Sequence, residues 1–162
     1  MRKIFIVLAV AVGLLAVSCD DDYTPSATLQ DLFNTQYPNA VDVDWERERK
    51  GYRVVEFRLN GQECEAYYKN GKWVLTEYSI RYSELPAAVS SAFESSWGTA
   101  TPIDSIYRVE RNTTQNEVVY VIEIQEAQQY GVADVYLYYA PDGELLRKWI
   151  ELENVDYIDY YL

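Results

Sequence analysis

Apolar and polar side chains alternate along residues 52–80, and two Asn-Gly pairs, Asn60-Gly61 and Asn70-Gly71, interrupt the alternation. Asparagine and glycine tolerate the positive φ angles of a type I′ turn, so each pair predicts a tight β-hairpin. If both turns have two-residue loops, the two hairpins share one register. This register places eight residues on one mostly apolar face: Val55, Phe57, Leu59, Cys64, Ala66, Tyr68, Trp73 and Leu75.

The other face of these strands is mostly charged. A slip of one residue would turn every apolar side chain toward water, so the pattern fixes the register. We therefore predict a three-stranded antiparallel meander with one buried face. The outward set is Val54, Glu56, Arg58, Glu63, Glu65, Tyr67, Lys69, Lys72, Val74, Thr76 and Tyr78.

A helix is expected before this meander. Leu29, Leu32 and Phe33 follow Pro25 at helical spacing, and Pro38 ends the run.

A strand should connect this helix to the meander, because residues 41–48 alternate apolar with acidic side chains. A three-residue loop at residues 49–51 would extend the buried face. The expected cross-strand pairs are Trp45 with Val55 and Val43 with Phe57.

The same arrangement recurs in the second half of the chain. Residues 85–97 form a second amphipathic pattern, in which Phe93 and Trp97 match Phe33 and Tyr37 at one offset, 93 − 33 = 60 and 97 − 37 = 60. Four further strands are expected near residues 102–111, 117–125, 132–140 and 144–152.

These matches predict an internal duplication. The expected fold class is α+β, a tandem repeat of a helix plus a four-stranded antiparallel β-meander with the helices on one face of the sheet. Repeat 1 would span residues 25–83 and repeat 2 residues 84–153, and residues 154–162 would form a C-terminal tail or an edge strand.

The second sheet differs from the first in its outward face. Val118, Tyr120, Ile122, Ile124, Val135, Leu137, Tyr139 and Leu145 are expected to face the helix. The opposite face is largely apolar too and holds Val119, Val121, Tyr136, Tyr138, Leu146, Lys148 and Ile150. Such a face needs a cover, which the other repeat, the C-terminal tail or a partner could provide.

The N-terminus resembles a bacterial lipoprotein signal. Residues 1–18 combine a basic start, an apolar stretch and a small-residue site before Cys19, which would become the lipidated N-terminus. Residues 19–24 would be a tether. The resemblance implies a lipid-anchored protein of the cell envelope, on the periplasmic side or on the outer surface of the outer membrane.

The charge of the chain excludes nucleic acid as a partner. Removal of Arg2 and Lys3 leaves 14 − 2 = 12 basic residues against 26 acidic ones, a net charge near −14. Lipidation of Cys19 would leave Cys64 without a disulfide partner, so we expect a small buried hydrophobe at Cys64.

The side chains needed for most catalysis are missing. The sequence has no histidine and no glycine-rich phosphate loop. Its acidic residues are expected to spread across an open sheet face, where they would be solvated, so we predict no catalytic residues, no cofactor and no metal. Weak Ca²⁺ binding by such oxygen ligands stays open.

The abundance of tyrosine, 16 residues in 162, is the positive signal. Tyrosine is a strong strand former, and it also suits recognition surfaces. The residues that we expect to contact a partner are Tyr67, Tyr78, Val119, Tyr136, Tyr138 and Leu146.

These motifs resemble the PepSY-like family of exported proteins, which is related in fold to the β-lactamase inhibitor protein. The segments that carry the resemblance are Phe33 to Ala40, Tyr67 to Trp73, Leu85 to Val89 and Asp142-Gly143. The resemblance implies helices packed on one side of antiparallel sheet and a free side for a partner.

We therefore expect a non-enzymatic envelope lipoprotein that binds a protein or peptide through the aromatic-rich open sheet face, and the family resemblance implies an inhibitor of the peptidase type. The alternative is a structural or glycan-binding surface lipoprotein. An acid-dependent hydrolase would require closely spaced carboxylates in a pocket.

Overall fold

The computed structural model describes residues 23–47, 51–113, 117–128 and 131–150. Within these stretches two α-helices accompany one antiparallel sheet of eight strands, in the order β1-β2-β3-β4-β5-β6-β7-β8. The elements are α1 (Ala27–Gln36), β1 (Val41–Arg47), β2 (Tyr52–Leu59), β3 (Gln62–Lys69), β4 (Lys72–Ser79), α2 (Ala87–Trp97), β5 (Ile103–Arg111), β6 (Val118–Gln128), β7 (Gly131–Tyr139) and β8 (Leu145–Ile150).

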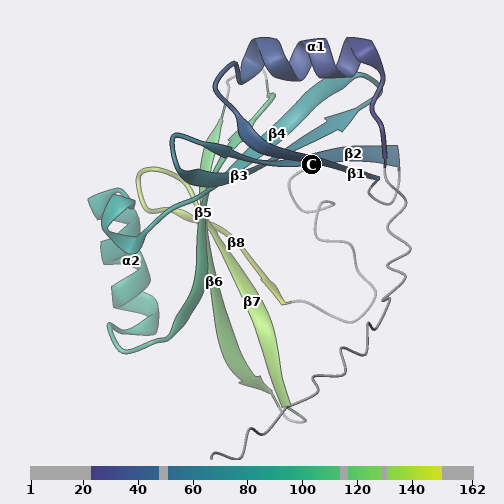
Figure 1. Ribbon diagram of the computed structural model, residues 1–162. Helices are drawn as coiled ribbons and strands as arrows, with labels where there is room; N and C mark the ends of the chain where they lie inside the picture. The colour runs from purple at the N-terminus through teal and green to yellow at the C-terminus, as the bar shows by residue number, and fades with distance from the viewer. Residues whose placement is uncertain (1–22, 48–50, 114–116, 129–130, 151–162) are drawn as a thin grey trace, which may run out of the picture.

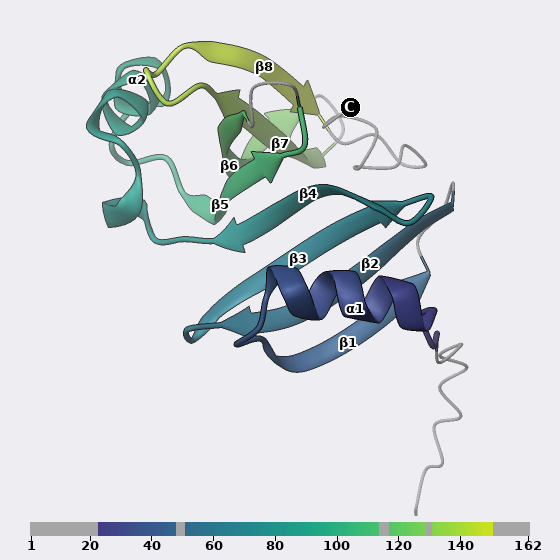
Figure 2. The ribbon, with the colours of Figure 1, turned by 90° about the horizontal axis from the view of Figure 1, so that it is seen from above.

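The sheet is sharply bent between its two halves (Figures 1 and 2). α1 lies over β1 to β4 and α2 lies over β5 to β8, both on the convex side. The two halves therefore form one continuous sheet, joined by the pairing of β4 with β5, and their concave sides face each other. The α+β class and the position of the helices on one face are as predicted.

The first hairpin has the predicted register. Phe57 pairs with Cys64 and Val55 pairs with Ala66. Asn60 and Gly61 adopt φ angles of 55° and 83°, the left-handed values that a type I′ turn needs.

The second hairpin departs from the predicted register at a β-bulge next to Val74. Tyr68 pairs with Trp73 as expected, but Tyr67 pairs with Leu75, so that Ala66 meets Thr76 instead of Leu75. The prediction was wrong from this point on, because an extra residue in one strand reverses the face of every residue after it. Thr76 and Tyr78 consequently turn toward α1, and Leu75 turns to the concave side.

A second bulge lies at the corresponding place in β8. Tyr139 pairs with Leu145, but Tyr138 pairs with Arg147, so Leu146 is the extra residue. The predicted faces of β8 are therefore reversed after Leu146. Ile150 packs on the α2 side, and Lys148 lies over the Trp97 ring on the same side, 4.8 Å from its centroid.

β1 confirms one predicted pair and contradicts the other. Trp45 pairs with Val55, but a bulge between Val41 and Asp44 prevents the pairing of Val43 with Phe57. Val43 is consequently 42% exposed and does not extend the buried face.

Each helix buries its apolar stripe against its own half of the sheet. Under α1, Phe33 makes edge-to-face contact with Phe57 and Trp45, at centroid distances of 5.1 and 5.5 Å. Ser26 caps this helix by accepting a hydrogen bond from the Leu29 amide. Under α2, Val89 and Phe93 take the equivalent places.

A third apolar cluster fills the concave side. This concave-face cluster joins residues of both halves: Tyr52, Val54, Tyr67, Leu75, Val109, Val119, Val121, Tyr138 and Trp149. All of them are at most 8% exposed. The apolar face that the sequence left without an assigned cover is thus packed in part against the other half of the same sheet.

Gly143 provides a test of how the β7–β8 turn packs on α2. Gly143 has a φ of 90°, and a Cβ atom there would lie 2.5 Å from the carbonyl oxygen of Ala88. Gly71 occupies the corresponding turn with a φ of 70° and has open space around it. Alanine should cost about 1–2 kcal/mol at either site for the left-handed backbone. Gly143→Ala should cost at least about 3 kcal/mol in total, because backbone must also move.

Urea unfolding of Gly143→Ala and of its matched control Gly71→Ala checks this expectation. Equal losses of unfolding free energy would show that the turn does not press on α2.

Candidate functional site: the concave face

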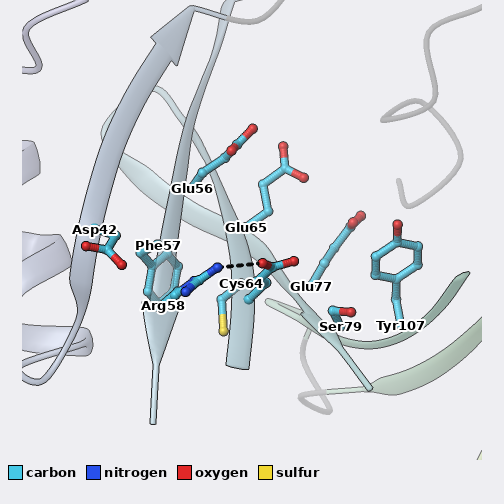
Figure 3. A pocket seen from close by; sticks show the side chains of 10 residues that line it. Asp42, Glu56, Phe57, Arg58, Cys64, Glu65, Glu77, Ser79 and Tyr107 are labelled. Carbon is cyan, nitrogen blue, oxygen red and sulfur yellow. Dashed lines mark hydrogen bonds and ion pairs between the residues drawn. The ribbon is translucent and has the colours of Figure 1, made fainter. Parts of the chain in front are cut away.

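Beyond its apolar cluster, the concave face carries mostly charged and polar side chains. A hollow of about 380 Å³ opens there across β1 to β5 (Figure 3). We call it the acidic hollow, and its lining residues are Asp42, Glu56, Phe57, Arg58, Glu63, Cys64, Glu65, Glu77, Ser79 and Tyr107.

Strand alternation brings the acidic side chains together. Glu56 and Glu65 are opposite each other in the β2–β3 ladder, and Glu65 is opposite Glu77 in the β3–β4 ladder. Successive side chains of a strand point to opposite faces, so one row across three strands presents three carboxylates to the same side. Figure 3 shows these side chains pointing into the hollow beside Tyr107.

The hollow combines exposed and buried acidic groups. Glu77 is only 4% exposed, whereas the side chain of Glu63 is 71% exposed and pairs with Arg58 at 2.9 Å. Such an exposed pair adds little stability. Burial raises the pKa of the Tyr107 hydroxyl, and Glu123, Glu77 and Glu65 raise it further, although a hydrogen bond with Ser105 acts in the opposite direction. Tyr107 is therefore a neutral hydrogen-bonding group next to the carboxylates.

The gathering of these carboxylates was not predicted. The sequence pattern placed them on one face, but it indicated a flat, solvated surface and contained no information on the bend. Tyr107 comes from β5, in the second half of the chain, and its pairing with Ser79 brings it to the hollow. Across the part of the chain that the structure describes, no three Cys, Asp or Glu side chains converge as a metal site.

Four of the residues that we expected to contact a partner do lie on the concave side but are largely buried or half-buried there. Tyr67, Val119 and Tyr138 are 6%, 2% and 4% exposed within the concave-face cluster. Tyr136 stacks on Trp149 at a centroid distance of 5.0 Å. Leu146, at the bulge, is 47% exposed.

Tyr78 lies on the opposite side of the sheet from the predicted one. Its hydroxyl donates to Glu110 at 3.1 Å, and Arg108 lies over its ring at 4.3 Å from the centroid. Arg108 in turn donates to Glu110 at 2.5 Å. Burial raises the pKa of Tyr78, and Tyr37 and Glu110 add to the effect. Tyr78 therefore joins β4 to β5 on the convex side and is not part of the concave face.

Cys64 is a structural side chain behind the hollow. Figure 3 shows its sulfur pointing away from the neighbouring carboxylates, and it packs in the α1 core at 6% exposure. Burial raises the pKa of its thiol to about 11. A thiol that is protonated at neutral pH is a poor nucleophile and a poor metal ligand.

The fold defines the class of protein. The family described as beta-lactamase-inhibitor-like, PepSY-like matches residues 52–147, and the chain belongs to this family. The resemblance identified from the sequence is confirmed.

Solved structures share the fold over most of the chain. One is a BLIP-like protein from Bacteroides fragilis, with 26% identity and a TM-score of 0.69 over 83% of this chain and 94% of that chain. Another is a DUF2874 family protein from Bacteroides ovatus, with 26% identity and a TM-score of 0.70 over 82% of this chain and 93% of that chain. No curated protein matches the chain significantly.

Neither described helix has the length and apolar character needed to cross a bilayer.

The position of Cys64 can be tested by its reactivity. In a Cys19→Ser variant, where Cys64 is the single thiol, the reaction with a disulfide reagent at about pH 8 should be roughly a hundredfold slower in the native than in the urea-unfolded protein. The native protein should react more slowly because its raised thiol pKa leaves less of the reactive thiolate. Burial of the sulfur slows the reaction further.

The matched control carries Cys19→Ser with Glu63→Cys and Cys64→Ala, because residue 63 is the neighbour on the exposed face. Its thiol should react at nearly the same rate with and without urea. A native Cys64 that reacted as fast as this control would contradict the assignment of strand faces.

Proposed function

We propose that this chain is a non-enzymatic binding protein that holds a protein or peptide partner on the concave face of its sheet. The acidic hollow is the observation that carries the proposal. It is open, it is formed by a fixed strand scaffold, and its charge favours a partner segment rich in Lys and Arg.

The chemistry of the hollow supports binding over catalysis. A carboxylate-based hydrolase needs one carboxylic acid held protonated by apolar surroundings next to an ionised one. Here the acidic side chains line an open hollow together with Arg58, Ser79 and Tyr107, and the chain has no histidine to act as a base. The family membership and the BLIP-like protein of similar fold add support for an inhibitor-type binding protein.

We further propose that the protein is exported and lipid-anchored through Cys19 after removal of residues 1–18. The lipoprotein-like leader supports this. Tyr23, where the described chain begins, lies against Arg53 of β2, with 4.9 Å between the guanidinium carbon and the ring centroid. The tether would therefore leave the domain near the start of β2.

The tandem repeat of residues 25–83 and 84–153 is also a proposal. The equivalent bulges at Val74 and Leu146 support it, because each follows a turn that contains glycine and each lies opposite a Tyr-Tyr pair. A bulge costs a ladder pairing, so its recurrence at one place in both halves favours common descent over coincidence.

Site-specific photo-crosslinking in the producing cell tests the binding face. A benzoylphenylalanine at Ser79, in the acidic hollow, should form defined protein adducts, and the same group at Leu32 on α1 should not. Glu56→Lys combined with Glu65→Lys should lower the adduct yield at least about tenfold, because like charges then face the partner.

The matched control reverses two exposed acidic residues outside the hollow, Asp104→Lys and Glu144→Lys, and should keep the yield. Equal adduct yields from the probes at Leu32 and at Ser79 would refute the proposal. Adducts at Ser79 that persist in the Glu56→Lys, Glu65→Lys variant would refute it as well.

A further inference from the structure

The described chain is fixed to one end of the first half of the sheet. The Arg53 guanidinium lies over the Tyr23 ring. Two residues on, Pro25 is buried, and its carbonyl oxygen accepts a hydrogen bond from the Gln30 side chain at 3.4 Å. Figure 2 shows the start of α1 at the same end of the first half as the β3–β4 turn, with the β2–β3 turn at the opposite end.

Three cations lie at this end. Arg53 donates to the carbonyl oxygen of Tyr52 at 2.8 Å, and the Lys69 ammonium lies 4.1 Å from the centroid of the Tyr52 ring. Lys72 is exposed and is the cross-strand neighbour of Lys69. None of the three forms an ion pair with a carboxylate of the described residues. We call Tyr23, Arg53, Lys69 and Lys72 the tether end.

The tether end is close to neutral as a whole. Residues 20–22 are all aspartate and supply three negative charges against these three cations. Arg111 and Glu117 form an ion pair that is balanced in itself, and Glu46 adds one carboxylate on β1.

The opposite end of the same strands is strongly acidic. The acidic hollow carries five carboxylates and one cation, Arg58. Along β2, its residues Glu56, Phe57 and Arg58 follow Arg53 by three to five positions, which corresponds to about 10–17 Å. The first half therefore separates its charge along the strands.

The lipid anchor proposed at Cys19 would lie close to the tether end. The four residue steps from Cys19 to Tyr23 span at most about 14 Å, even when fully extended. An anionic lipid surface repels the acidic hollow more strongly than the nearly neutral tether end. Charges farther from the surface than the Debye length of about 8–10 Å are largely screened, so this repulsion is weakest when the hollow points outward.

We propose that the anchored protein faces the lipid headgroups with its tether end and directs the acidic hollow away from the bilayer. This inference rests on the proposed lipid anchor at Cys19. It also restricts the partner. The hollow receives a basic segment of a protein that approaches from the aqueous side, and not a chain embedded in the same membrane.

Quenching by spin-labelled lipid headgroups tests this orientation. The chain from Cys19 onward, with Cys64→Ala, is coupled through Cys19 to a maleimide lipid in vesicles of phosphatidylglycerol and phosphatidylcholine, part of which carries a nitroxide headgroup. A fluorophore is attached to an azidophenylalanine at Lys72 or, as the matched position, at Glu63, which is exposed on the hollow. Quenching at Lys72 should exceed quenching at Glu63 at least about fivefold, because the two positions lie at opposite ends of the strands.

Charge reversal at either end provides the matched variants. With the probes unchanged, Arg53→Glu combined with Lys69→Glu should lower this ratio at least about twofold, because the tether end is then repelled as well. Arg58→Glu combined with Arg81→Glu makes the same change of charge in two exposed ion pairs near the hollow and should leave the preference for Lys72 intact. Equal quenching at Lys72 and Glu63 of the unreversed protein, or stronger quenching at Glu63, would overturn the inference.

The quenching result is independent of any partner and of processing in the cell, because the lipid is attached chemically. Equal quenching together with adducts at Ser79 would refute the orientation and support the proposed binding face. Mass spectrometry of the chain purified from the producing cell tests the anchor itself. A Cys19 without acyl chains would refute the proposed anchoring, whatever the quenching ratio.

Discussion

Both helices cover the convex side of the eight-stranded sheet, so the apolar side chains on its concave side must be buried in another way. The rest of the structure depends on this constraint. The concave face of β5 to β8 is rich in apolar side chains, and leaving it in water would forfeit the main driving force of folding. The bend at β4 and β5 solves this, because it brings Val54 and Tyr67 of the first half against Val119 and Tyr138 of the second. The acidic hollow exists because this apolar packing stops at Leu75, and the next concave residue of β4 is Glu77.

Two bulges determine which side chains take part in this packing. Without the extra residue at Val74, Leu75 and Glu77 would turn toward α1, and Thr76 and Tyr78 would turn to the concave side. Without the one at Leu146, Trp149 would leave the concave face. Bulges also increase the local twist of a strand, which suits a sheet that must curve around its own face.

The concave face, which we propose for partner binding, is formed by strands that hold its charges at fixed positions. Glu56, Glu65 and Glu77 lie in one row across three strands, so they act together on an approaching partner. With a chain of strongly negative net charge behind it, this row should affect the rate of encounter and the choice of partner more than the final affinity. On the other side of these strands, Cys64, Tyr68 and Tyr78 pack in the core under α1.

Local sequence by itself determined the elements of this protein. The Asn-Gly turns, the alternation along β1 to β3 and the helical spacing in α1 and α2 predicted both helices, the strands of the first half and the first hairpin register, and the recurrence of this pattern predicted the four strands of the second half. These features depend on interactions between residues that are near in the chain, so they can be read from it. Tertiary structure alone decided the bulges, the bend and the identity of the exposed concave residues. A bulge is selected by which residue packs best against distant partners, as Thr76 does by accepting a hydrogen bond from Trp73 and sharing another with Tyr37. Alternation marked Tyr67 and Glu65 equally as outward, and only the approach of the second half of the sheet buried the first and left the second in a hollow.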